Sequence, residues 1–400
     1  MSKRLKIAIV VPGRWSAFEL ATALSERGHE VALLTNYPKW AVKRFGVDIR
    51  IVRSGWHNFI FAHAAHRLHT RCRLPLPESA IAGHFTRWAA RELKGEHWDA
   101  VLICSQFAEE VLHALAGRTT LTILNRENSH IRAHARVLEE EERRTGISIA
   151  QPSPWAIARE EREYELVDRI RVVARFSRQT FLDEGVPADK VLCIPSGAPI
   201  EAFQPTPGLL EERCRRIRSG QPLRVIYVGA KILRKGLWDL FTIVSELHGP
   251  RFRFRVVGPE SSEANGILCK LAPMAELLPK QPQRLLPHQY AWADLYILPS
   301  LEEGFPQTTA QAWANGLPIL TTPNGGGLEF VTEGHTGWVL PIRTPQAFVE
   351  RLRWCDAQRE DLATMVQSIP QRCIPRRWGT VAEEFERVVR NYLSASSASA

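Results

Sequence analysis

The sequence predicts an α/β protein built from two doubly wound parallel-sheet domains in series. Short apolar runs that suit buried strands alternate with helical segments, which is typical of parallel sheets covered by helices. The alternation starts afresh after a stretch rich in proline and glycine between residues 197 and 220. The length of 400 residues, with 44% hydrophobic and 24% charged residues, suits two globular domains of ordinary size.

The first half of the chain supplies the first set of elements. A helix is expected over Ala17–Arg27, with its apolar residues toward the core, and it ends at Gly28. The expected buried strands are Ile7–Val11, Val31–Thr35, Ala100–Cys104, Leu121–Leu124 and Val191–Pro195. The turn after the first strand contains Gly13 but lacks the GxGxxG spacing of dinucleotide-binding dehydrogenases.

The second half repeats this plan. A helix is expected over Leu237–Leu247, and the expected strands are Leu223–Val228, Phe252–Val257, Leu295–Leu298 and Leu317–Thr321. We therefore expect a first domain over 1–197 and a second over 198–372. A last helix is expected within 373–393, and the Ser/Ala tail over 394–400 is expected to fray.

The composition argues against several classes of protein. No run of about eighteen apolar residues occurs, so no membrane-spanning helix is expected. The N-terminus lacks the features of a signal peptide, which predicts a cytoplasmic protein. The seven cysteines show no metal-ligand spacing, so we expect reduced, mostly buried thiols and no zinc site.

The net charge of +9, from 52 basic and 43 acidic residues, indicates an anionic partner. Anionic sugar nucleotides and anionic lipid head groups both fit this sign. Nucleic acid also fits it, but the chain carries no helix-turn-helix, zinc-finger or RNA-recognition signature. Nucleic acid is therefore not expected as a partner.

The most informative stretch follows the strand Leu295–Leu298. It reads Pro-Ser-Leu-Glu-Glu-Gly-Phe-Pro over 299–306 and opens onto a short helix that ends in Asn-Gly. A strand, turn and helix in this order point backbone N–H groups and the positive end of the helix dipole toward an anion. Glu303 stands at the turn, and Gln311 lies about two helical turns further on, roughly on the same face.

This stretch resembles the donor-site signature of retaining family-4 glycosyltransferases, which have the GT-B fold of two Rossmann-like domains facing across a cleft. In that family, two Glu residues are separated by seven positions and the first is followed by Gly-Phe-Gly. The chain keeps the spacing, but Gln311 replaces the second Glu and Pro306 replaces the second Gly. The resemblance covers nearly the whole chain. It implies that the last helix, Trp378–Tyr392, crosses back to the first domain.

The resemblance also implies a set of residues for a nucleotide-sugar donor. Glu303 would hold a hydroxyl of the donor sugar, and Gln311 would contact the ribose. The amides of 307–309 would bear part of the charge of the diphosphate. The donor-binding residues expected around them are Gly13, Gly304, Phe305, Gln307, Thr308 and Thr309.

A basic loop follows the strand Leu223–Val228 and contains Lys231, Arg234 and Lys235. Cations at the carboxyl end of a parallel strand are well placed to neutralise a diphosphate. Lys235 matches a Lys of the family, whereas Ala230 stands where the family has an Arg, so Arg234 or Lys231 is expected to take over that role. A solvated basic loop is the alternative reading.

The same cations bear on the need for a metal or cofactor. Fixed Lys and Arg charges can stabilise a nucleoside-diphosphate leaving group directly. The DxD carboxylate pair of metal-dependent transferases of the other common fold does not occur in this chain. We therefore expect transfer that needs no metal and no cofactor, with the nucleotide-sugar as a substrate.

A polar segment over 125–130 follows the strand Leu121–Leu124, where ligands bind in an open α/β sheet. The resemblance places a His of this loop near the anomeric carbon of the sugar. His130 matches by position and is expected to be catalytic together with Glu303, and His134 is its nearest rival. A surface-loop histidine without a catalytic role is the alternative.

Residues 53–73 interleave aromatic residues with arginine and histidine. Examples are Trp56, Phe59, Phe61, Arg67 and Arg71, and Arg73 closes the segment. In the first domain of a GT-B enzyme this segment would lie on the acceptor side, and its composition suits an anionic membrane interface. Peripheral contact with the inner face of the membrane is therefore a hypothesis. A packed helix with a basic outer face is the alternative.

Taken together, the sequence predicts a glycosyltransferase that retains the anomeric configuration. It would move a sugar from a nucleotide-sugar to a hydroxyl of a glycan or a lipid-linked glycan. A non-catalytic nucleotide- or carbohydrate-binding paralogue is one alternative, which Gln311, Ala230 and Pro306 keep open. A sugar-nucleotide epimerase of the same fold is the other alternative, although epimerases lack the helix signature that Glu303 and Gln311 form in this chain.

Overall fold

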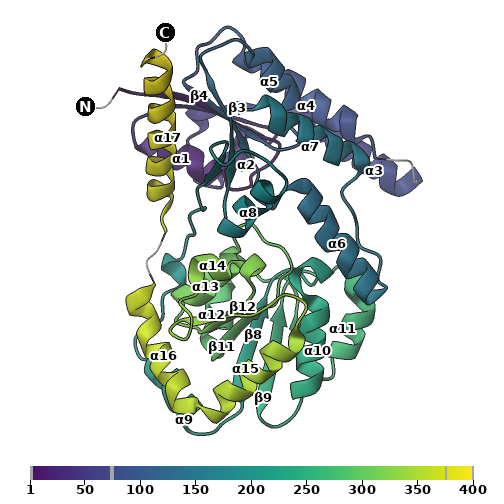
Figure 1. The fold of residues 1–400 in the computed structure, drawn as a ribbon, viewed down its shortest axis with the longest axis vertical. Coiled ribbons are helices and arrows are strands. Elements are labelled where there is room, and N and C mark those ends of the chain that lie inside the picture. Colours follow the sequence, from purple (N-terminus) through teal and green to yellow (C-terminus); the bar gives the residue numbers. More distant parts are fainter. Residues whose placement is uncertain (1–2, 73–75, 374–375, 399–400) are drawn as a thin grey trace.

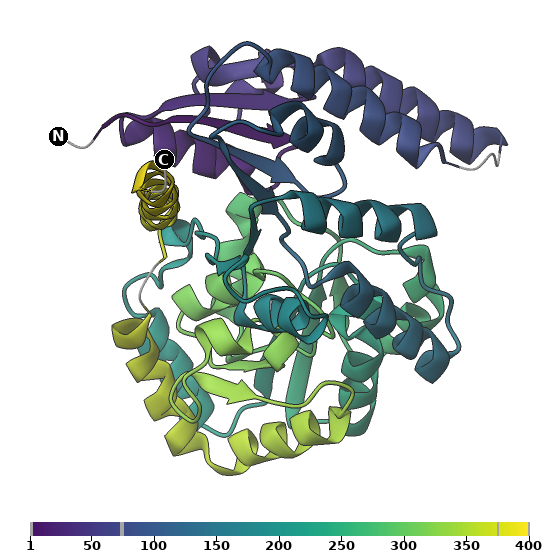
Figure 2. The same cartoon turned by 45° about the horizontal axis from the view of Figure 1, so that its top comes forward.

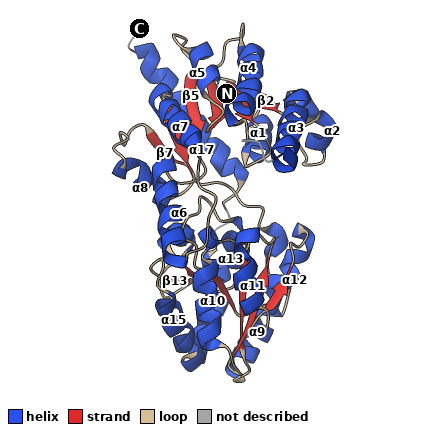
Figure 3. Cartoon of the chain, turned by 90° about the vertical axis from the view of Figure 1, so that its right-hand side faces the viewer, coloured by secondary structure: helices blue, strands red, loops and turns tan. Residues whose placement is uncertain are grey.

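The computed structural model of the chain describes residues 3–72, 76–373 and 376–398. It contains two α/β domains that lie one above the other along the long axis of the molecule (Figure 1). Each domain has its own parallel sheet, and the strands lie between layers of helices (Figure 3). The predicted fold class, two doubly wound parallel-sheet domains, is confirmed.

The first domain holds a seven-stranded parallel sheet in the order β3-β2-β1-β4-β5-β6-β7. Its strands are β1 (Lys6–Val11), β2 (Glu30–Thr35), β3 (Val52–Ser54), β4 (Ala100–Cys104), β5 (Leu121–Asn125), β6 (Arg169–Val172) and β7 (Val191–Cys193). The strand order reverses at β1, which pairs with both β2 and β4. The loop after β1, which contains Gly13, therefore opens at the switch point, where open α/β sheets bind ligands.

Helices cover both faces of this sheet. They are α1 (Ala17–Glu26), α2 (Lys39–Lys43), α3 (Trp56–Cys72), α4 (Glu78–Leu93), α5 (Glu109–Leu115), α6 (Ile131–Thr145), α7 (Pro154–Leu166) and α8 (Arg175–Asp183). One core cluster joins α1 to the sheet, and a second joins α4 and α5 to the opposite face. The pair α3 and α4 projects sideways from this domain (Figure 2).

The second domain holds a six-stranded parallel sheet in the order β10-β9-β8-β11-β12-β13. Its strands are β8 (Leu223–Val228), β9 (Phe252–Val257), β10 (Glu276–Leu278), β11 (Leu295–Leu298), β12 (Ile319–Thr321) and β13 (Gly337–Val339). Its helices are α9 (Leu209–Arg218), α10 (Leu237–Leu247), α11 (Asn265–Leu271), α12 (Leu286–Trp292), α13 (Gln307–Ala314), α14 (Gly327–Phe330), α15 (Pro345–Ala357) and α16 (Arg359–Arg372). β8 and β11 are parallel neighbours, so the loops that follow these two strands begin at the same edge of the sheet.

The last helix, α17 (Trp378–Ala398), returns from the second domain and packs on α1 (Figure 1). Val381, Phe385 and Val389 are fully buried in the core of the first domain. The expectation of a frayed tail over 394–400 is wrong as far as Ala398, because alanine favours the helix and no glycine or proline interrupts it. Residues 399 and 400 lie outside the described part of the chain.

Helix α6 comes from the first half of the chain but docks against the second domain (Figure 3). Its Leu138 belongs to the hydrophobic core of the second domain. Arg144, near the end of α6, forms an ion pair of 2.7 Å with the buried Asp239 of α10. Arg343 reaches back from the second domain to Glu140 at 2.6 Å. α6 therefore ties the two domains together.

The seven cysteines are all free thiols, as expected. The expectation that most of them are buried is wrong, because only Cys214 and Cys355 are. Cys72 and Cys269 are exposed, since they lie on outer faces of α3 and α11.

Within residues 3–72, 76–373 and 376–398, no helix combines the length and the hydrophobicity that a bilayer crossing requires. The same residues include no group of three or more His, Cys, Asp or Glu side chains that could hold a metal ion.

Candidate functional site

Glu303 lies in the loop between β11 and α13, and 7% of its surface is exposed. Its Oε1 accepts a hydrogen bond of 2.6 Å from Lys235 Nζ and one of 2.9 Å from Ser300 Oγ. Lys235 lies in the loop after β8, the strand next to β11. Neighbouring parallel strands end at the same edge of the sheet, so the loop after β8 can reach Glu303. The two motifs predicted separately from the sequence, the Glu-Gly turn and the basic loop, therefore meet in one place.

Glu302, the residue before Glu303, is fully buried and was not predicted as a site residue. Its Oε1 accepts hydrogen bonds of 2.9 Å from both the backbone N–H and the hydroxyl of Ser129, in the first domain. Its Oε2 lies 2.9 Å from Arg234 Nη1 and 3.2 Å from His134 Nδ1. Glu302 thus joins the donor loop to the first domain.

The charge of Glu302 depends on these partners. Burial by itself would raise the pKa of Glu302, but His134, Arg234 and the Ser129 amide outweigh it. Together they hold the pKa of Glu302 well below its usual range, so this carboxylate stays ionised. The sequence offered one signal for Glu302, namely two consecutive carboxylates after a buried strand, but not its partner loop in the other domain.

His130 does not reach the donor loop. Its ring packs between Tyr164 and Phe181, at centroid distances of 4.9 and 5.0 Å, and its Nδ1 accepts from the backbone N–H of Arg132 at the start of α6. Burial lowers the pKa of His130 to about 4, which keeps the ring neutral near pH 7. His134, the rival in the sequence, is the histidine that the structure brings to the donor loop.

Gln311 is buried on α13, where its Oε1 accepts a hydrogen bond of 3.0 Å from the Tyr290 hydroxyl. The hydroxyl of Thr308, one turn earlier, accepts one of 3.0 Å from Tyr296. These side chains therefore point to buried tyrosines, and the sequence pattern alone did not reveal that.

Lys231 lies apart from the other two cations of the basic loop. Its side chain is fully buried and forms an ion pair of 3.0 Å with Glu260. Arg234 and Lys235, in contrast, contact Glu302 and Glu303. Of the three predicted cations, these two are the ones assembled at the donor loop.

A pocket of about 400 Å³ lies between the two domains, next to this loop. The second domain contributes Phe305 and Gln307 to its lining, and the first contributes Arg14, Trp15 and Glu127. Its size suits a small polar ligand. We call it the interdomain pocket.

Two predicted glycines border the interdomain pocket. Gly13 precedes Arg14 in the loop after β1, and its carbonyl accepts a hydrogen bond of 3.0 Å from Thr35. Gly304 follows Glu303 and lies so close to the first domain that a Cβ atom there would overlap the carbonyl oxygen of Glu127. Glycine at 304 therefore permits the two domains to meet at the donor loop.

Comparison with known proteins finds that the chain is similar to glycosyltransferases. Residues 222–356 match the family model described as Glycosyl transferases group 1. The D-inositol 3-phosphate glycosyltransferase of Corynebacterium urealyticum is 28% identical over 251 residues, which cover 57% of this chain and 58% of that protein. The amylovoran biosynthesis glycosyltransferase AmsK of Erwinia amylovora is 24% identical over 208 residues, 48% of this chain and 49% of that protein. The chain thus matches about half the length of these curated relatives.

The fold agrees with solved structures. The Anabaena protein HepE, solved in complex with UDP and glucose, superimposes with a TM-score of 0.67, with 97% of this chain and 100% of that one covered. The sequence identity is 13%, so this likeness shows the fold alone. That fold is GT-B, as expected.

Proposed function

We propose that this chain, a group 1 glycosyltransferase by its second domain and a GT-B protein by its fold, transfers a sugar from a nucleotide-sugar to a hydroxyl acceptor. The observation that supports this most is the pair of Lys235 and Glu303, 2.6 Å apart at the start of α13. A cation and a helix N-terminus at one sheet edge suit the diphosphate of such a donor, which is the leaving group, and the carboxylate beside them suits a hydroxyl of its sugar.

In this proposal each group has a distinct role. Negative charge develops on the diphosphate as its bond to the sugar breaks. This charge is stabilised by Lys235, by the amides at the start of α13 and by Arg234 next to Lys235. Glu303 holds a sugar hydroxyl and so fixes the anomeric carbon relative to the acceptor. His134, held against Glu302, is the histidine nearest to this chemistry among those considered.

Retention of the anomeric configuration and independence from metal are parts of the proposal. Retention rests on the resemblance of the donor motif, and no second carboxylate is assigned as a nucleophile. Independence from metal rests on the fixed charges of Lys235 and Arg234 at the place where a metal would otherwise neutralise the diphosphate.

The relatives indicate which substrates to test first. HepE was solved with UDP and glucose, so uridine nucleotides are the first donors. The names of two relatives mention D-inositol 3-phosphate and the biosynthesis of amylovoran. We therefore propose a glycan or a lipid-linked glycan as the acceptor class.

The first test is thermal stabilisation by a panel of nucleoside diphosphates and their sugars. A ligand present at a hundred times its Kd should stabilise the protein by roughly 2.7 kcal/mol. Lys235→Ala should abolish the shift, because it removes the cation next to Glu303. Lys270→Ala, on the exposed face of α11, is the matched control and should keep it. No shift for any nucleotide with the wild-type protein would contradict the proposal.

Turnover separates the proposal from its alternatives. A transferase releases nucleoside diphosphate only when an acceptor is present, and Glu303→Gln should lower that rate at least about a hundredfold. Nucleotide binding without turnover would favour a non-catalytic binding protein. Conversion of the nucleotide-sugar without any acceptor would favour an epimerase.

The surface of α2 and α3 supports a contact with anionic membranes as a second part of the proposal. Trp40, Trp56 and Ile60 are exposed to 64, 53 and 55%, and the two tryptophans line one shallow hollow. Leu68, also exposed, continues the stripe two turns after Ile60. No Asp or Glu occurs between residues 49 and 77, whereas Arg67 and Arg71 do. Arg73, part of the predicted segment, lies outside the described residues.

Flotation with liposomes tests this contact. The wild-type protein should float with vesicles that contain anionic lipid, less so at high salt, and not with neutral vesicles. The double variant Trp56→Ser, Ile60→Ser should lose binding, because these side chains would enter the interface. Leu285→Ser, an exposed apolar residue of the second domain, is the control. Binding that the double variant leaves unchanged would refute the contact.

A further inference from the structure

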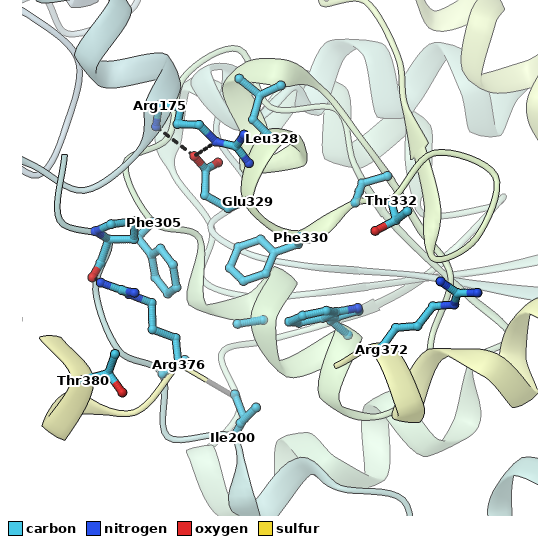
Figure 4. Close-up of a pocket in the computed structure, with 15 residues that line it drawn as sticks. Arg175, Ile200, Phe305, Leu328, Glu329, Phe330, Thr332, Arg372, Arg376 and Thr380 are labelled. Atoms are coloured by element: carbon cyan, nitrogen blue, oxygen red, sulfur yellow. Dashed lines mark hydrogen bonds and ion pairs between the residues drawn. The ribbon is translucent and has the colours of Figure 1, made fainter. Parts of the chain in front are cut away.

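A second cavity, of about 570 Å³, adjoins the donor loop and is drawn in Figure 4. It shares only Phe305 with the interdomain pocket. Along the segment 195–200, which links the domains, Pro195 and Ala198 line this cavity, whereas Ser196 and Pro199 line the interdomain pocket. The two hollows therefore lie on opposite sides of the link, and we call the second one the linker cavity.

Three aromatic residues form a continuous wall of the linker cavity. Phe330 of α14 lies 5.1 Å from Phe305 and 5.8 Å from Trp313 of α13, measured between ring centroids. The interplanar angles are 60° and 63°, so these rings do not stand parallel to each other. Ala310, also on α13, is the small residue that leaves the space in front of this wall open.

Polar groups without partners stand around this wall. Glu329 accepts a hydrogen bond of 2.8 Å from the backbone N–H of Arg175 through Oε1, but its buried Oε2 has no partner among the described residues. The buried Nε1 of Trp313 likewise has none there. Such groups are rare in folded proteins, because each costs free energy until a ligand or water satisfies it. They favour a polar ligand over an alkyl chain.

An arginine side chain lies at the end of the linker cavity opposite Glu329. Figure 4 shows Arg372 on one side of Phe330 and the pair Arg175 and Glu329 on the other. Arg372 is exposed, and its guanidinium makes no ion pair or hydrogen bond within the described part of the chain. Arg376, the third arginine of the lining, is already paired with Glu384. Arg372 is therefore the guanidinium that an incoming anion can bind.

We propose that the linker cavity binds an anionic saccharide, either a sugar phosphate or an acidic residue of a glycan chain. The C–H face of a pyranose packs on a single aromatic face, while its hydroxyls bond polar groups at the edge. Phe330, which Trp313 meets edge-on, provides the face, Glu329 an acceptor, and Arg372 the partner for phosphate or carboxylate. A nucleobase fits less well, because the three aromatic rings of this wall do not stand parallel and so do not enclose a flat ring.

The ligand would touch both domains and the donor helix at once. Arg175 belongs to the first domain, Glu329 to the second, and Ala310 lies on α13, one residue before the proposed ribose contact Gln311. The site is separate from the donor site, and its occupation requires no turnover. Binding there can therefore be tested whether or not the chain proves to be a transferase.

Isothermal titration with three probes tests the proposal. It also distinguishes the two possible sources of the anionic saccharide, a free sugar phosphate and an acidic glycan chain. The probes are α-D-glucose 1-phosphate, a disaccharide that contains glucuronic acid, and the neutral disaccharide maltose. We expect at least one of the anionic probes to bind at least about tenfold more tightly than maltose. Binding of the phosphate alone identifies a free sugar phosphate, and binding of the glucuronate alone identifies a glycan chain. Failure of both anions, or equal binding of all three probes, overturns the proposal.

Variants place the binding in the linker cavity. Arg372→Gln should weaken the anionic probe about tenfold or more, whereas Arg215→Gln, an exposed arginine on α9, should not. Ala310→Leu should block the cavity, and its thermal unfolding shows whether it remains folded. Lys235→Ala should leave saccharide binding intact while it weakens nucleotide binding. Displacement of the saccharide by UDP, or an unchanged affinity in Arg372→Gln, would overturn the assignment.

Discussion

Glu302 and Glu303 are neighbours in the chain but occupy opposite situations in the structure. Glu302 contacts Ser129 and His134 from the first half of the chain and Arg234 from its own domain, so it joins the two domains. Glu303 has Lys235 at 2.6 Å, and Arg234 lies further away at 4.0 Å. In the proposed reaction, Lys235 would turn to the diphosphate and leave Glu303 available for a sugar hydroxyl.

His130 provides a prediction about pH. Its pKa in the folded protein is lowered to about 4, below the roughly 6.5 of an exposed histidine. Between these values the unfolded chain binds a proton that the folded protein does not, so stability falls as the pH falls through this range, by up to about 1.4 kcal/mol per pH unit. His130→Gln should remove this contribution. Chemical denaturation between pH 7 and 4 checks it, and a pH-independent difference between the two proteins would contradict it.

At this scale, part of the site could be predicted from sequence. Lys235 and Glu303 were predicted from separate motifs, because each directly follows a strand of the same sheet. The sequence could not predict which of His130 and His134 reaches the donor loop, since both lie within about one turn of the start of α6. Only the docking of α6 on the second domain determines which of them meets Glu302.

Among the elements, α17 returns from the far end of the chain and completes the core of the first domain. Its Phe385 is fully buried against the α1 side of the first sheet. Phe385→Ala should cost about 3–5 kcal/mol of stability, because a large buried ring leaves a cavity. Denaturant titration measures this, with Glu383→Ala on the exposed face of the same helix as the control. A loss below about 1 kcal/mol would show that α17 is only loosely attached.

The long, apolar elements were predictable, whereas several of the short ones were not. β1, β4, β8 and α10 were found within one residue of their bounds, because their periodicity is strong. β3, β10 and β13 span three residues each and were not predicted. β7 and β12 are equally short, but they lie within the longer predicted runs Val191–Pro195 and Leu317–Thr321. The continuation of α17 to Ala398 does not follow from a Ser/Ala composition, which also suits a frayed end, although alanine favours the helix.

For the whole molecule, the approach of the two domains at Gly304 is the most sensitive contact. A methyl group at this position would overlap the Glu127 carbonyl, so Gly304→Ala should move the domains apart. Small-angle scattering should then show a larger radius of gyration, and nucleotide-induced stabilisation should decrease. Gly266→Ala, which has open space around it on α11, should change neither. An unchanged radius of gyration would show that the Glu127 loop yields instead.

The two-domain plan itself followed from the sequence, because the alternation of strands and helices occurs twice. The way in which the domains are joined did not follow from it. Arg144 with Asp239 and Arg343 with Glu140 are ion pairs between residues far apart in the chain. No local pattern predicts such pairs, and they depend on how the two finished domains dock.

The path of α17 has a consequence for synthesis. The residues that complete the core of the first domain, such as Val381 and Phe385, follow β7 by almost 190 residues. At roughly 5–20 residues per second, the ribosome delivers them about ten to forty seconds after the rest of that domain. During this interval the apolar side of α1 lacks its cover, so the nascent chain presents a hydrophobic surface on which a chaperone could act. For the same reason, a fragment that ends after β7 should be prone to aggregation.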